Sequence, residues 1–213
     1  MTGGAGFGAF VERVAEHSFG AAFAIFRDVD AALECREAAA IRRANAAAYL
    51  DARAGRAPLL LVGEAMGYAG GRFTGIAFTA ERTLRGWGAP YEGTSVRPEG
   101  WAEQSGTIVH GALATLGLEA GTVLWNVVPA HPHRPGEPLS NRTPAVAELR
   151  AGAEVLGELI ERLEPRAIVA VGRSAERALG ELGLPVDACV RHPANGGATA
   201  FRTGLERYVL SAP

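Results

Sequence analysis

Residues 59–71 read LLLVGEAMGYAGG, an apolar run that passes directly into a glycine-rich loop. A short run of Leu and Val closed by Gly63 is typical of a strand that is buried on both faces in a parallel sheet. Comparable apolar runs occur at residues 122–128, 167–171 and 186–190. The sequence therefore predicts four buried strands, the first of which ends before Gly63.

Segments with helical character separate these apolar runs. Thr143 followed by Pro144 is a favourable helix start, because an N-cap residue precedes a proline at the first helical position. The expected helices cover residues 8–16, 35–54, 80–86, 105–116, 143–163 and 172–182, and a last helix or strand lies within 200–210. Strands that alternate with helices form a parallel sheet covered on both faces. We therefore expect an α/β fold, a three-layer α/β/α sandwich around a four-stranded, mainly parallel sheet.

The length of 213 residues fits one domain. We expect a single domain over residues 1–213, with residues 1–55 forming an N-terminal helical segment packed on it. No apolar run approaches the ~20 residues that span a bilayer. The N-terminal residues lack the basic region of a signal peptide. These features predict a cytoplasmic protein.

The most unusual segments follow three of the expected strands. They are the glycine-rich loop at 63–75, Asn126 with the loop at 129–142, and the stretch RHPANGG at 191–197. In open α/β sheets, ligands bind where parallel strands end at their carboxyl edge. The sequence therefore predicts that these segments meet in one site.

The charged residues restrict the chemistry of that site. All 21 basic residues are arginines, so no lysine is present for a Schiff base or a P-loop. The net charge of −2 argues against strong indiscriminate binding to nucleic acid, although a small basic DNA footprint remains compatible with it. Arg134 and Arg142 are candidates for such a phosphate-facing patch.

We expect neither a cofactor nor a metal. The glycine loop does not match the G-x-G-x-x-G fingerprint of dinucleotide-binding proteins. His131 and His133 supply two ligands, and a zinc site needs three or four. Cys35 and Cys189 are too few for a disulfide framework or an iron–sulfur cluster.

Four side chains have two interpretations each. Asn126 lies inside an apolar strand, where its amide either makes a structural hydrogen bond or reads the edge of a base. His192 directly follows a strand, and it is either structural or catalytic. Glu64 and Glu81 flank the glycine loop as capping or surface carboxylates, and Glu81 is also a candidate for positioning a water molecule.

Four segments, taken in order, resemble motifs of the uracil-DNA glycosylase superfamily, in particular the branch whose first motif reads GEAPG. They are GEAMG at 63–67, TGIAF at 74–78, WNVVP at 125–129 with NRTP downstream, and HPANGG at 192–197. The similarity covers roughly residues 58–205. Met66 and Ala77 replace two prolines of the family pattern. The cysteines that hold an iron–sulfur cluster in similar relatives are absent, so the chain resembles a cluster-free member.

The resemblance implies roles for individual residues in binding an extruded base. Phe78 would stack on the base, Asn126 would hydrogen-bond the uracil edge at O4 and N3, and His192 would donate to O2. The backbone of Gly63, Glu64, Ala65 and Gly67 would also contact the base. Gly67 stands where a bulky residue blocks the C5 methyl group in relatives that exclude thymine.

The resemblance also implies how DNA and water are handled. The loop of Asn195, Gly196 and Gly197 would enter the minor groove. Ala65 stands where some relatives carry an aspartate or asparagine that handles the water, and so Glu81 becomes the candidate for orienting it.

The function expected from these features is that of a monofunctional DNA glycosylase. Such an enzyme hydrolyses the N-glycosidic bond of uracil or another deaminated base, after base flipping. Water is the nucleophile because no lysine is available. The expected partner is DNA, and we expect a monomer. Two alternatives remain: a non-catalytic binder of damaged or single-stranded DNA with the same fold, and an unrelated α/β enzyme that processes nucleosides or nucleotides.

Overall fold

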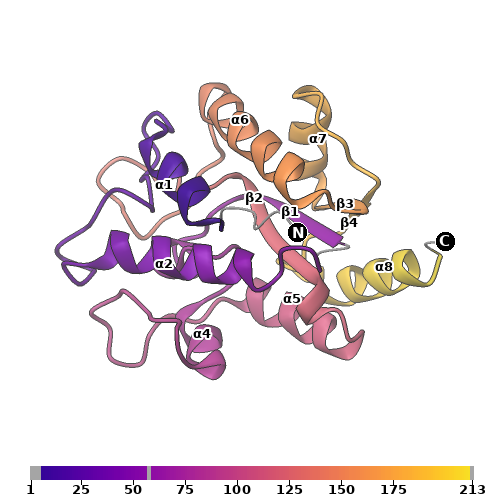
Figure 1. Cartoon of the computed structure of the whole chain (residues 1–213), viewed down its shortest axis with the longest axis horizontal. Helices are drawn as coiled ribbons and strands as arrows, with labels where there is room; N and C mark the ends of the chain where they lie inside the picture. Colours follow the sequence, from indigo (N-terminus) through magenta and orange to yellow (C-terminus); the bar gives the residue numbers. More distant parts are fainter. Residues whose placement is uncertain (1–5, 57–58, 212–213) are drawn as a thin grey trace.

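A parallel sheet of four strands forms the centre of the computed structural model, which describes residues 6–56 and 59–211 (Figure 1). The strand order is β2-β1-β3-β4, and every pairing is parallel. The strands are β1 (Leu59–Ala65), β2 (Thr122–Val128), β3 (Ala167–Val171) and β4 (Ala188–Val190). The four predicted strands are confirmed, and β1 continues past Val62 into the glycine-rich motif.

Helices lie on both sides of this sheet, with α6 and α7 on one side and α5 and α8 on the other (Figure 1). The helices are α1 (Gly8–Glu16), α2 (Ala38–Asp51), α3 (Gly71–Thr74), α4 (Glu81–Trp87), α5 (Gln104–Thr115), α6 (Val146–Leu163), α7 (Arg173–Glu181) and α8 (Ala198–Ser211). A 3-10 turn, Glu119–Gly121, precedes β2. The α/β sandwich predicted from the sequence is confirmed, and the last segment is a helix.

The start of α6 differs from the sequence prediction. Thr143 and Pro144 lie before the helix, which begins at Val146. The Glu148 carboxylate accepts the backbone N–H of Ala145 at 2.8 Å and pairs with both terminal nitrogens of Arg142. Ala145, whose ψ is 157°, is therefore the N-cap residue, and Glu148 at the third helical position satisfies its N–H.

The N-terminal helices pack on the same apolar core as the strands. The Phe10 ring of α1 lies 5.9 Å from the Trp125 ring of β2, centroid to centroid. In α2, the Tyr49 hydroxyl accepts the backbone N–H of Leu124 at 2.9 Å. Leu50 is fully buried in that core. We therefore propose that these helices and the sheet form one domain; residues 1–5, 57–58 and 212–213 lie outside the described part of the chain.

Within the described ranges, none of the helices combines the length and apolar character needed to cross a bilayer.

Candidate active site

A cavity of about 920 Å³ opens at the carboxyl edge of the sheet. Its wall includes residues 64–67 at the end of β1, Asn126 of β2, and His192 just after β4. Phe78, from the loop after α3, also lines it. The structure thus brings together the aromatic ring, the amide and the imidazole for which the sequence predicted a common site.

Gly63 leaves room for two of these side chains, although it does not line the cavity itself. It is paired in register with Asn126 across β1 and β2. A Cβ atom at Gly63 would lie 2.5 Å from Cζ of Phe78 and closer still to Oδ1 of Asn126. Only glycine lets both side chains approach the strand. Phe78 itself has a φ of 53°, a left-handed conformation that is uncommon for an aromatic residue.

Asn126 is 3% exposed, and its amide is poorly satisfied by the protein. Nδ2 donates to the Met66 sulfur at 3.1 Å, and a thioether is a weak acceptor. Among the described residues, no stronger partner contacts this amide. Of the two roles expected for Asn126, the structural one therefore amounts to a single weak hydrogen bond. The amide remains available to a ligand.

A backbone contact indicates which ring nitrogen of neutral His192 carries the proton. Its Nδ1 accepts the N–H of Ala194 at 3.1 Å. Burial, with a smaller contribution from Arg191, lowers the pKa of His192. A neutral imidazole carries one proton, so this ring has it on Nε2. The ring centroid lies 6.1 Å from that of Phe78, and Nε2–H is a neutral donor at the cavity wall.

Contacts from β2 and the following loop position the motif at the end of β1. The N–H of Met66 donates to the carbonyl of Ala130 at 3.1 Å. The buried His131 ring contacts the Met66 carbonyl through Nδ1 at 2.8 Å and the Pro138 carbonyl through Nε2 at 3.1 Å. Burial lowers the pKa of His131 to about 4, while the two carbonyl contacts act in the opposite direction. His131 therefore supports the motif structurally.

Glu64 contributes a half-buried carboxyl group to the cavity wall. Burial raises its pKa, while Arg177 and Ser174 act in the opposite direction. Ala65 and Gly67 line the cavity beside it.

The structure places Glu81 elsewhere, which corrects the role predicted for it. Its Oε1 accepts the N–H of Ser95 at 2.8 Å. Its Oε2 accepts the Ser95 hydroxyl at 2.5 Å and the N–H of Trp101 at 2.9 Å. Glu81 is 2% exposed and does not line the cavity. Both oxygens are committed to the segment between α4 and α5, so Glu81 has a structural role in this conformation.

The predicted DNA contacts divide into two groups. Arg142 and Asn195 line the cavity, although Arg142 is held by a bidentate pair with Glu148. Arg134 lies outside the cavity wall and pairs with Glu137 at 2.7 Å on the surface. Gly196 and Gly197 belong to the loop after His192 and are not part of the wall. A Cβ at Gly197 would collide with the His192 carbonyl, which explains that glycine.

Sequence reasoning missed Glu103, the residue before α5. Its side chain lines the cavity, and Oε2 is buried without a hydrogen-bond partner. Burial raises its pKa to about 7. A carboxylate at an N-cap position resembles an ordinary helix cap in the sequence, but this side chain makes no cap hydrogen bond.

Within the described residues, no group of three or more His, Cys, Asp or Glu side chains is placed to hold a metal ion. Cys35 and Cys189 are both free thiols there.

Comparisons with known proteins agree with this architecture. The family model described as the uracil DNA glycosylase superfamily matches residues 51–210, and so the chain belongs to that superfamily. The structure is similar to the crystal structure of wild-type Pedobacter heparinus SMUG2, with a TM-score of 0.62 and 15% sequence identity. That match covers 97% of this chain and 96% of the other. At this identity it establishes the shared fold alone. No curated protein matches the sequence.

Proposed function

We propose that the protein is a monofunctional DNA glycosylase that hydrolyses the N-glycosidic bond of uracil or another deaminated base. The observation that supports this most strongly is the convergence of Phe78, Asn126 and His192 on one cavity at the carboxyl edge of the sheet. Membership of the superfamily supports action on DNA and argues against an unrelated nucleoside-processing enzyme.

The proposed chemistry follows from where charge develops. Breaking the N-glycosidic bond places negative charge on the base and positive charge on the sugar. In this proposal, Nε2–H of His192 donates to O2 of the base, and the Asn126 amide pairs with O4 and N3. Donors that are already oriented towards developing charge act mainly in the transition state. Loss of one such donor is expected to cost ~3 kcal/mol, about a hundredfold in rate.

The base must leave the DNA stack to reach this cavity. Extrusion costs a few kcal/mol and is easiest at a mismatch or in a single strand. We propose that the exposed part of the Phe78 ring stacks on the extruded base. The motif at 64–67 would then lie along the base and the sugar.

Water is the proposed nucleophile because the chain has no lysine. Glu81 is occupied outside the cavity, and Ala65 has no polar side chain. We therefore assign the orientation of water to Glu64, whose carboxyl group lines the cavity next to Ala65. Burial raises the pKa of Glu64, and Arg177 and Ser174 offset part of this effect.

An oligonucleotide panel tests this function. Duplexes and single strands that carry one uracil, hypoxanthine, xanthine or mismatched thymine are incubated with the protein and then with alkali, which cuts at abasic sites. The proposal predicts a cut at uracil or at another deaminated base. The absence of a cut in every context contradicts it.

A second candidate is a non-catalytic binder of damaged or single-stranded DNA. It is favoured by Ala65 and by the placement of Glu81 outside the cavity. Tight binding of uracil-containing DNA without release of free base identifies this function. We propose a monomer in either case, and sedimentation with and without DNA tests that.

A further inference from the structure

Glu103 lines the cavity, and three nearby glycines leave room for its carboxyl group. A Cβ at Gly67 would lie 3.0 Å from Oε1 of Glu103, and one at Gly106 would lie 3.2 Å from Oε2. A Cβ at Gly70 would overlap the carboxyl group. At Gly67 and Gly70 the atoms nearest to the added Cβ belong to the Glu103 side chain, whereas at Gly106 the Phe78 carbonyl lies closer than Glu103.

The carboxyl group of Glu103 has no protein partner in the described structure. Oε2 is buried and unpaired, and the side chain does not cap α5. Burial of an unpaired carboxylate oxygen disfavours the charged form, so the position of Oε2 favours the neutral acid or a bound ligand. Its pKa is raised to about 7, and burial is the sole cause. No charged group on the loop at 67–70, on α3, on α5 or beside Phe78 therefore contributes to the shift.

We infer that Glu103, as a neutral carboxylic acid, donates a hydrogen bond to an acceptor on the extruded base and so helps to select the base. The inference rests on the proposed function. The substrates it favours carry a carbonyl oxygen or an unprotonated ring nitrogen on the edge that faces Gly67 and Glu103, which line the cavity together. An ionised Glu103 would present lone pairs to that acceptor and repel it.

This role differs from that of a general base. A general base must be ionised, so activity that depends on it rises with pH. A donor must be protonated, so binding that depends on Glu103 weakens as pH rises. Glutamine also separates the two roles, because its amide donates at every pH but cannot accept a proton from water.

The experiment measures binding of a duplex in which the single deoxyuridine carries a 2′-fluorine, which slows cleavage. Affinity is determined from mildly acidic to alkaline pH for wild type, Glu103→Gln, Glu103→Met and the control Glu161→Gln, an exposed residue of α6. Cleavage of ordinary uracil DNA by the same proteins is measured in parallel. His192 and Glu64 also titrate near the cavity, and they are unchanged in all four proteins.

The inference predicts that wild-type and Glu161→Gln affinity falls by up to about tenfold per pH unit above the pKa of Glu103. Glu103→Gln removes this alkaline decrease, and Glu103→Met binds more weakly than wild type at acidic pH. The inference is overturned if Glu103→Gln keeps the wild-type pH profile, or if it loses cleavage while binding is unchanged. If binding shows the predicted dependence on pH and on Glu103 but wild type releases no base, the result contradicts the proposed glycosylase activity alone.

Discussion

At the residue scale, Glu81 and Glu103 show how surroundings determine the use of a carboxyl group. Glu81 accepts three hydrogen bonds, from the backbone and hydroxyl of Ser95 and from the backbone of Trp101. Glu103 accepts none from the described residues, and burial raises its pKa to about 7. The first group stabilises a loop, whereas the second is available to a ligand.

Replacing Glu81 with glutamine should therefore reduce stability more than activity. The introduced NH₂ group would face backbone donors, and an unsatisfied buried donor costs about 1–3 kcal/mol. Urea unfolding should show a loss of this size, while base release at low temperature stays within a few-fold of wild type. A large loss of base release with unchanged unfolding would restore the water-orienting role to Glu81. Glu161→Gln is the matched surface control.

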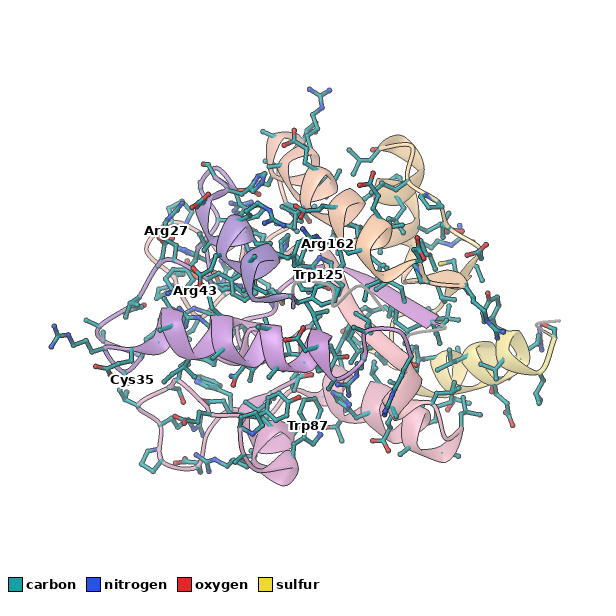
Figure 2. All side chains as sticks on the ribbon, viewed as in Figure 1. Arg27, Cys35, Arg43, Trp87, Trp125 and Arg162 are labelled. Atoms are coloured by element: carbon teal, nitrogen blue, oxygen red, sulfur yellow. The ribbon has the colours of Figure 1, made fainter. Side chains whose placement is uncertain are left out.

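At the scale of elements, the register between β1 and β2 builds the site. Gly63 is opposite Asn126, and the missing side chain at Gly63 lets Phe78 and Asn126 meet over the strand end. In Figure 2, which draws all side chains, the labelled Trp125 extends into the space between the sheet and the helices. Adjacent residues of β2 therefore point to different places, Trp125 into the core and Asn126 into the cavity.

Gly63→Ala should displace both side chains. The added Cβ would overlap the Asn126 amide and the Phe78 ring, so the rate of base release should fall at least tenfold while circular dichroism still reports the fold. Gly111→Ala on α5 is the control, because nothing lies within 4 Å of the place its added Cβ would take and alanine favours helices. Equal activity of the two variants would contradict this assignment.

The sequence predicted those elements whose formation is local. The apolar runs of β2 and β3 match the observed strands end to end, and Asn126 and His192 follow from their positions on or after strands. The start of α6 was missed because Glu148, the third residue of the helix, accepts the N–H of Ala145, so that Ala145 rather than Thr143 is the N-cap. Glu103 was missed for a different reason: Gly67 and Gly70, which leave room for its carboxyl group, belong to a loop more than 30 residues earlier, and only the tertiary fold brings them together.

At the scale of the whole molecule, two buried histidines and one buried glutamate have opposite effects on how stability changes with pH. Burial lowers the pKa of His110 and His131 from 6.5 to about 4 and raises that of Glu103 from 4.5 to about 7. Between pH 6.5 and 4.5 the unfolded chain binds more protons at the two histidines, so acidification removes stability. In the same range the folded chain binds more protons at Glu103, which adds stability on acidification.

The two histidines together remove more stability on acidification than Glu103 adds. The free energy of unfolding should therefore fall from pH 6.5 to pH 4.5. Glu103→Gln should steepen this loss by up to about 1.4 kcal/mol per pH unit, because the opposing group no longer titrates. Urea unfolding across this range measures the slope. A slope unchanged by Glu103→Gln would mean that the carboxyl group is not protonated in the folded protein.

The absence of lysine also predicts the outcome of a trapping experiment. A glycosylase with lyase activity forms a Schiff base that borohydride reduces to a stable protein–DNA adduct, and the N-terminus is the sole amine available here. Borohydride should therefore trap no adduct while base release continues. An adduct of wild type that disappears when the N-terminus is acetylated would contradict the monofunctional mechanism.

The most direct test of the account is the release of free base from uracil-containing DNA, identified by mass, under single-turnover conditions. Wild type should release the base, and Asn126→Ala and His192→Ala should each be slower by about a hundredfold while remaining folded. Wild-type rates in both variants would contradict the claim that the ring of Phe78, the amide of Asn126 and the imidazole of His192 surround the reacting base.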